Sequence, residues 1–254
     1  MTSAPDLCLT RTGHVAHLEM RRQAPGYIDL DFARRLADQL EALDADDGCR
    51  AIVLSSAGKT FCAGADFGGV TEGKPDPGPF YEQAMRLFRT RKPIVAAVQG
   101  AAIGAGLGLA VVADFRVVGP SARLAANFNR LGIHPGFGLT LTLPRLVGEQ
   151  QAALLFFTGR RIDGAEAQRI GLADDLVADA EVLARALALA AEIAESSPTA
   201  VESTRASLRL GLAERIAEVN RREREIQIGQ MGSADFREGV AAMAARRPAN
   251  FTRS

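Results

Sequence analysis

Two runs of small residues, each placed directly after a predicted β-strand, constrain the fold of this chain more than any other feature. Residues 61–66 read FCAGAD and follow the apolar stretch 51–55, and residues 100–108 read GAAIGAGLG and follow the apolar stretch 93–98. Residues without bulky side chains let backbone N–H groups approach a ligand closely. Two such turns side by side would offer two N–H donors to one oxygen, which is the geometry of an oxyanion hole.

The rest of the first half alternates predicted strands with predicted helices, which indicates an α/β fold. Thr12 and Gly13 separate two strand-like runs and predict a hairpin over residues 7–20, while Asp29 or Asp31 can cap a helix that begins near residue 30. Hydrophobic spacing and flanking turns predict four further elements: a helix over 80–90, a strand over 94–98, a buried helix over 107–113 and a strand over 115–118.

Residues 68–79 contain four glycines and three prolines and are expected to form a loop. Its position beside the first turn favours a lid over a ligand, and an ordinary surface excursion is an equal alternative. From Gln150 onward the chain is predicted to be almost entirely helical, with long amphipathic helices over 181–196 and 212–230. We therefore expect a core of residues 1–197 followed by a C-terminal helical region of residues 198–254.

Composition narrows the class of protein. The 254 residues include 30 basic and 30 acidic side chains, so no general attraction to nucleic acid or to an anionic membrane is expected. Three scattered cysteines argue against a disulfide framework, and no metal-binding spacing occurs. No apolar run approaches the length of a membrane span and no signal peptide is evident, so we expect a cytoplasmic protein.

The sequence resembles the crotonase superfamily, also called the enoyl-CoA hydratase/isomerase family. The two turns carry this resemblance together with segments that follow in the family's order over nearly the whole chain: ADFRV at 113–117, LGIHPGFG at 131–138, LPRLVG at 143–148, TGRRI at 158–162, GLA at 171–173, DFREG at 235–239 and RPANF at 247–251. The resemblance implies a spiral of strand–strand–helix (ββα) turns with a C-terminal helical region that holds a homotrimer, or a hexamer of two trimers, together. It also implies an acyl-CoA thioester as substrate, no separate cofactor, and a place in fatty acid metabolism.

The family pattern assigns the oxyanion donors to the backbone N–H groups of Ala65 and Ala105, where they would stabilise an enolate of the thioester carbonyl. The substrate-binding positions implied by the same pattern lie in or beside the turns: Ala63, Gly64, Asp66, Gly104, Gly108, Phe128 and Gly136.

Two of these positions depart from the family's hydratases, which carry a glutamate at each of them. Here they are Gly108 and Phe128, so hydration by two glutamates is not expected, and the isomerase route loses support. His134 is the candidate acid or base that remains, since histidine transfers protons near neutral pH. The alternatives are a non-catalytic acyl-CoA carrier, or a decarboxylase, dehalogenase or carbon–carbon hydrolase of the same fold that uses another base.

Two other enzyme classes fit the sequence poorly. A dinucleotide-binding turn that starts at Gly104 and Gly106 would need glycine or alanine at the position of Leu109, and no acidic residue follows at the required distance. A nucleophilic hydrolase of related fold would need a serine at the second turn, and residues 100–113 contain none.

Overall fold

The computed structural model of the chain describes residues 6–66 and 76–254. Its strands are β1 (Leu7–Thr12), β2 (Val15–Met20), β3 (Ala51–Ser56), β4 (Ile94–Val98), β5 (Ala101–Ile103), β6 (Phe115–Val118), β7 (Arg123–Ala125) and β8 (Asp175–Leu176). Its α-helices are α1 (Leu30–Asp44), α2 (Gly78–Arg86), α3 (Ala105–Val112), α4 (Leu139–Val147), α5 (Glu149–Thr158), α6 (Gly164–Arg169), α7 (Val182–Glu195), α8 (Pro198–Leu208), α9 (Leu212–Met231) and α10 (Ala234–Ala244). Short 3-10 helices are η1 (Leu87–Arg89), η2 (Asn127–Leu131) and η3 (Asp179–Glu181).

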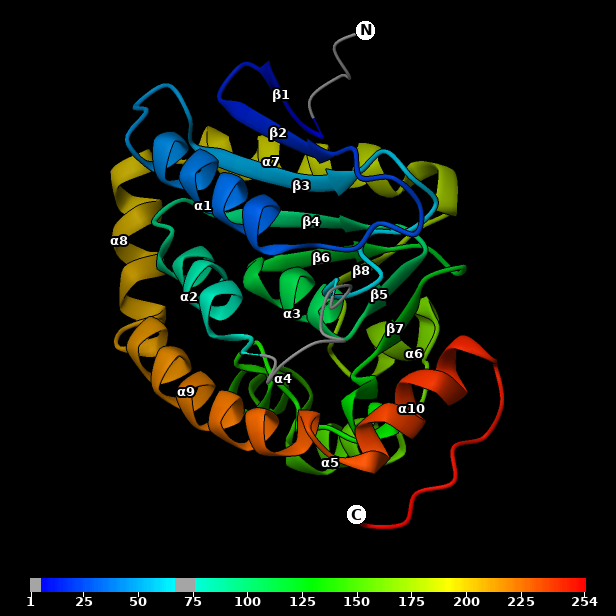
Figure 1. Ribbon diagram of the computed structural model, residues 1–254. Helices are drawn as coiled ribbons and strands as arrows, with labels where there is room; N and C mark the ends of the chain where they lie inside the picture. The colour runs from blue at the N-terminus through cyan, green and yellow to red at the C-terminus, as the bar shows by residue number, and fades with distance from the viewer. Residues whose placement is uncertain (1–5, 67–75) are drawn as a thin grey trace, which may run out of the picture.

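The strands form a large and a small sheet that the chain visits in turn. The large sheet has the order β1-β2-β3-β4-β6-β8, in which only the β1–β2 hairpin is antiparallel, and β5 pairs with β7 in the small sheet. The chain repeats one unit, which consists of a strand in the large sheet, a short extended segment and then a helix. Repeating this ββα unit one strand further along produces the spiral in Figure 1.

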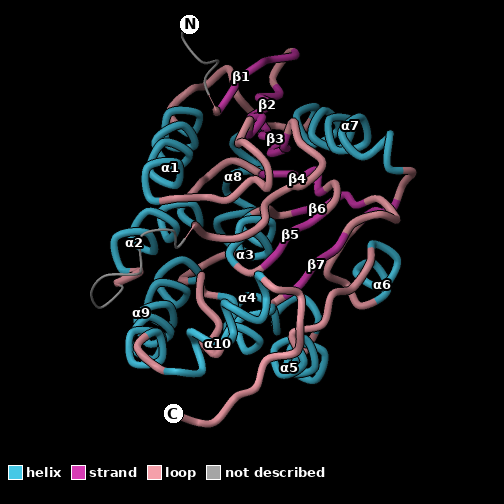
Figure 2. Tube along the Cα trace, turned by 45° about the vertical axis from the view of Figure 1, so that its right-hand side comes forward, coloured by secondary structure: helices cyan, strands magenta, loops and turns pink. Residues whose placement is uncertain are grey.

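The two faces of the large sheet are covered by different parts of the chain. Side chains alternate across a strand, so Val53, Val95 and Val117 face one side and pack with α7, while Ile52, Leu54 and Ala96 face the main core under α1, α2 and α3. Figure 2 shows α7 apart from the other helices, on its own side of the sheet.

Several boundaries differ from those expected from sequence. Helix α2 begins at Gly78, inside the segment predicted as a loop, with Pro79 in its first turn, where a missing N–H costs no hydrogen bond. Helix α3 begins at Ala105, because Gly104 turns the chain directly into it. The central part of the predicted lid, including Glu72, lies outside the described residues.

The C-terminal helices continue around the core rather than forming a separate body. Helix α9 packs against α2, α4 and η1, and α10 packs against η2 (Figure 1). The amphipathic interpretation of α9 needs correction, because the centre of its buried face is polar: Asn220, Glu223 and Gln227 lie between Ile216 and Met231. No helix in the described part of the chain is long and apolar enough to span a membrane.

Candidate functional site

The structure places the two small-residue turns side by side. Cys62 and Ala102 form a parallel bridge, in which the Cys62 N–H donates to the Ala101 carbonyl at 2.9 Å and the Ile103 N–H donates to the Cys62 carbonyl at 3.0 Å. A Cβ on Gly106 would lie 2.2 Å from the Cys62 carbonyl oxygen. Glycine at 106 is therefore required for this close approach of the two turns.

Ala65 and Ala105 hold matching places in the paired turns, each three residues beyond a member of the Cys62–Ala102 bridge. Within residues 6–66 and 76–254, neither the Ala65 N–H nor the Ala105 N–H donates a hydrogen bond. The Ala105 N–H is a first-turn donor of α3, where the helix dipole adds positive potential. Gly104 reaches this geometry with φ of 56°, a value suited to glycine.

The segment after β2 holds the first turn in place. The Ile28 N–H donates to the Gly64 carbonyl at 2.9 Å, and the Asp66 N–H donates to the Ile28 carbonyl at 2.8 Å. The Ala63 N–H donates to the Gly26 carbonyl at 3.2 Å. With its backbone fixed on both sides and Asp66 exposed to solvent, Ala65 has a defined orientation at the edge of the site.

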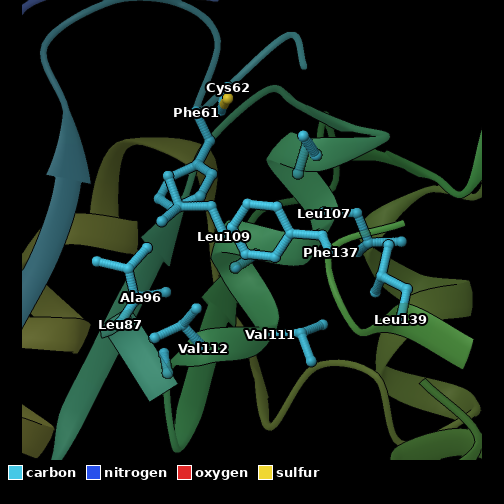
Figure 3. Close-up of a cluster of buried hydrophobic side chains, with 14 of the residues drawn as sticks. Phe61, Cys62, Leu87, Ala96, Leu107, Leu109, Val111, Val112, Phe137 and Leu139 are labelled. Atoms are coloured by element: carbon cyan, nitrogen blue, oxygen red, sulfur yellow. The ribbon is translucent and has the colours of Figure 1, made fainter. Parts of the chain in front are cut away.

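Phe137 occupies the space in front of Gly108. A Cβ on Gly108 would lie 2.5 Å from Cγ and 2.8 Å from Cβ of Phe137. Helix α3 can therefore approach the Phe137 ring this closely only because residue 108 has no side chain. Phe137 is fully buried and has φ of 64°, which is uncommon for a residue other than glycine. Figure 3 shows its ring among the side chains of α3. The space beside Gly108 is therefore closed by an aromatic ring.

Phe128 lies against the second turn. Its Cζ is 3.9 Å from the place where a Cβ on Gly104 would stand, and the Oδ1 of Asn127 is 3.3 Å from the same place. Both residues belong to η2 and are buried. One aromatic ring and one amide therefore border the second turn.

His134 and Gly136 lie in the loop before α4, which α9 holds in place. The His134 N–H donates to Gln230 at 2.6 Å, and Gln227 donates to the His134 carbonyl at 2.7 Å. The His134 Nδ1 lies 2.7 Å from the Pro135 carbonyl oxygen, so the half-buried ring is engaged within its own loop. A Cβ on Gly136 would lie 2.0 Å from the Tyr81 hydroxyl oxygen. The missing side chain at 136 therefore allows Tyr81 of α2 to lie directly against the loop.

Two residues that shape the site, Glu223 and Gln227, have no sequence prediction attached to their role, and the sequence leaves open whether a third, Tyr81, points toward the site. Tyr81 donates to Gln227 at 2.9 Å, and burial raises the pKa of the Tyr81 hydroxyl. The Glu223 carboxylate accepts from the Gly138 N–H at 2.7 Å and from the Thr140 N–H at 3.0 Å, at the start of α4. The sequence pattern that could have identified Glu223 and Gln227 is their spacing of four residues, which places both side chains on one face of α9.

A surface pocket of about 500 Å³ lies between the beginnings of α1 and α2 and includes none of the residues of the two turns. Its lining is mixed in charge and polarity: Asp29, Leu30, Asp31, Arg34, Pro79, Glu82 and Gln83. In the described part of the chain, no group of three or more His, Cys, Asp or Glu side chains could hold a metal ion.

Comparison with known proteins identifies the family to which the sequence is similar. The sequence model of the enoyl-CoA hydratase/isomerase family matches residues 10–254. A probable enoyl-CoA hydratase of Rhizobium meliloti is 34% identical over 249 residues, covering 96% of this chain and 97% of the relative. A probable enoyl-CoA hydratase of Mycobacterium tuberculosis is 41% identical over 186 residues, covering 70% of this chain and 71% of the relative.

The fold is also found among solved structures. The crystal structure of an enoyl-CoA hydratase/isomerase from Pseudoalteromonas atlantica superimposes with a TM-score of 0.88 at 30% identity, covering 98% of this chain and all of that one. The predicted crotonase-like architecture, a mixed α/β spiral with a C-terminal helical region, is confirmed.

Proposed function

The chain belongs to the enoyl-CoA hydratase/isomerase family, and on this basis we propose that it is an acyl-CoA thioester enzyme that acts through an enolate. The Ala65 and Ala105 N–H groups bind the thioester oxygen and stabilise the negative charge that develops on it. The pairing of the two turns at Cys62 and Ala102 carries this proposal, because Ala65 and Ala105 lie at matching positions in the paired turns and their N–H groups donate to no residue that the structure describes. Loss of one such donor typically costs about 3–4 kcal/mol of transition-state stabilisation.

The same site lacks the two carboxylates that would move protons during hydration. Glycine is present at 108 and phenylalanine at 128, and a positioned acid or base typically contributes about 10²–10⁴-fold to a rate. Crotonyl-CoA hydration should therefore be slow. A kcat/KM near ~10⁷ M⁻¹s⁻¹, in the range of fast enzymes, would contradict this part of the proposal.

A non-catalytic acyl-CoA carrier is the second candidate, and the ring of Phe137 in front of Gly108 favours it. A third is a decarboxylase, dehalogenase or carbon–carbon hydrolase that uses His134 as its base. A turnover screen over a panel of acyl-CoA thioesters separates the enzyme from the carrier. Loss of turnover in His134→Ala, with unchanged thioester affinity, would assign the base.

Assembly is part of the proposal, as a homotrimer or a hexamer of two trimers. Three large apolar side chains of the helical half lie open to solvent in the single chain: Phe157 is 77% exposed, Leu208 is 74% exposed and Leu210 is 87% exposed. Exposed apolar groups of this size favour contact with another subunit.

The direct test of the proposal is calorimetry with butyryl-CoA, free butyrate and free CoA. We expect the thioester to bind more tightly than either part, because only the thioester places a polarisable carbonyl at the paired N–H groups while CoA anchors it. Equal affinity for butyryl-CoA and CoA would show that the turns do not bind the carbonyl. Absence of binding by all three ligands would refute the thioester site as a whole.

A further inference from the structure

A cluster of arginines lies at the opposite end of the large sheet from the paired turns. The turns follow the carboxyl ends of β3 and β4, whereas Asp114 lies directly before β6 and accepts from the N–H of Ile94, the first residue of β4, at 2.9 Å. Asp114 also accepts from Arg205 of α8 at 2.9 Å and from Arg209 at 3.0 Å. Figure 1 shows α8 beside the end of the sheet from which the arrows of β3 and β4 start. The cluster is therefore separate from the proposed acyl-CoA site.

The charge of Asp114 is already matched by Arg205. Both oxygens of the Asp114 carboxylate accept from the Arg205 Nε, at 3.0 and 2.9 Å. The Arg205 guanidinium also donates to the carbonyl and hydroxyl oxygens of Thr90. Arg205 is buried, so it requires a countercharge from within the chain. Arg209 therefore shares a carboxylate that is already paired.

Arg209 and Arg145 supply a surplus of positive charge beside this pair. The Arg209 side chain is only 18% exposed, and its Nη1 contact with Asp114 is the one hydrogen bond that its guanidinium makes to a residue that the structure describes. Arg145, in the last turn of α4, is exposed, and its guanidinium donates to none of the described residues. Burial lowers the pKa of Arg209, and the charges of Arg205 and Arg145 lower it further. Arg145 is therefore close enough to act on Arg209.

The nearest acidic side chains on α8 and α9 face other arginines. Glu202, three residues before Arg205, lies 3.9 Å from Arg91. Glu214, in the first turn of α9, lies 3.3 Å from Arg89. Among the described residues, the three guanidinium groups of the cluster are therefore paired with one carboxylate, which leaves two positive charges.

We infer that Arg145 and Arg209 form a binding site for the phosphate group of a small molecule. Asp114 orients Arg209 through Nη1, which leaves the rest of its planar fork to bind the anion, and guanidinium forks bind phosphate oxygens in pairs. A phosphate monoester carries a charge of about −1.5 to −2 at pH 7, which suits the two surplus charges. The inference goes beyond the proposed function, because the site shares no residue with the paired turns.

Calorimetry with inorganic phosphate tests the inference on the full-length protein, with sodium chloride added to keep the ionic strength constant so that screening does not change. The wild type should bind phosphate, and phosphate should raise its melting temperature. Arg145→Gln should weaken binding about 10-fold or more, the effect of removing one charged hydrogen-bonding group. Because Arg145 makes no hydrogen bond to the described residues, this variant should keep the wild-type melting temperature when phosphate is absent.

Two further variants separate a built site from general attraction to charge. Arg161→Gln removes an exposed arginine between α5 and α6, changes the net charge by the same amount and should bind phosphate like the wild type. Arg209→Lys keeps the positive charge but loses the planar fork, so it should weaken phosphate binding.

Each remaining outcome overturns the inference. Absence of phosphate binding by the wild type does so, as does equal binding by the wild type and Arg145→Gln. An equal loss in Arg161→Gln would show general attraction only. If Arg145→Gln loses affinity for free CoA along with phosphate, the cluster belongs to the CoA site. If phosphate does not bind and light scattering finds a smaller assembly for Arg145→Gln than for the wild type, the cluster belongs to a subunit contact.

Discussion

The contact between Gly108 and Phe137 predicts a large effect from one added methyl group. In Gly108→Ala the new Cβ would stand 2.5 Å from Cγ, 2.6 Å from Cδ1 and 2.8 Å from Cβ of Phe137. Carbon atoms normally approach no closer than about 3.5 Å. The atoms in conflict lie at the base of the ring, so rotation of the side chain does not relieve all three contacts. Either the loop that contains Phe137 or helix α3 has to move.

The size of the effect follows from two opposing contributions. Overpacking of a core typically costs about 1–3 kcal/mol, and contacts this short fall at the upper end. Replacing glycine by alanine inside a helix stabilises the folded state by about 1 kcal/mol. The net loss is therefore about 2 kcal/mol. For a domain of this size that corresponds to a decrease of about 4–8 °C in melting temperature.

Urea and thermal unfolding followed by circular dichroism, at a fixed protein concentration, would measure this loss. Gly229→Ala is the matched control, because Gly229 is an exposed residue of α9 and a Cβ there would meet nothing within 4 Å. The control should be stabilised by up to about 1 kcal/mol. In a double-mutant cycle with Phe137→Ala, the combined loss should be smaller than the sum of the single losses. A melting temperature of Gly108→Ala at or above the wild-type value would refute the packing argument.

Three further predictions concern the turns, an ion pair and assembly. Gly106→Ala should push the turns apart at Cys62 and weaken butyryl-CoA binding in calorimetry; unchanged affinity would contradict the pairing. The Arg35 guanidinium, through a hydrogen bond, lowers the pKa of Asp6 from 3.8 to about 2. Asp6→Asn should therefore be less stable than the wild type above about pH 4, and urea unfolding should show this difference vanish as the pH falls through about 2. Light scattering at micromolar concentration should find a trimer or hexamer, and a monomer would leave Phe157 of α5 in water and argue against the proposed assembly.

The elements around the turns could be predicted because their signals are local. The hairpin of β1 and β2, the N-cap of α1 at Asp29 and strands β4 and β6 all agree with the sequence predictions. Each depends on a short pattern of alternating or helically spaced residues next to a capping or turn residue. The spiral itself followed from the resemblance to the family, since pairing between Cys62 and Ala102 involves segments about 40 residues apart.

The side chains that complete the site could not be predicted in the same way. Phe137 lies between two glycines, and no local pattern indicates that the phenylalanine adopts a positive φ. Glu223 and Gln227 bond to a loop some 85 residues earlier in the chain, as between Glu223 and the Gly138 N–H. A helix with many charged residues, such as α9, is expected to lie on the surface, and only tertiary contacts reveal that a face containing Asn220, Glu223 and Gln227 is buried.

The paired turns have no carboxylate at positions 108 and 128, and this bears on the kind of reaction that the proposed site favours. Backbone donors depend on the path of the chain, which Gly104 and Gly106 maintain whatever side chain faces the acyl group. Proton transfer depends on the side chains at 108 and 128, which here are absent and apolar. When the α-carbon of the acyl group carries a carboxylate, cleavage of the bond between them releases carbon dioxide and leaves the electron pair on the α-carbon, so the enolate forms without a base and then takes a proton from water. Within the proposed function, this combination favours decarboxylation over hydration, because the enolate forms by loss of carbon dioxide without a base and needs only a proton afterwards, whereas hydration requires both a positioned base and a positioned acid.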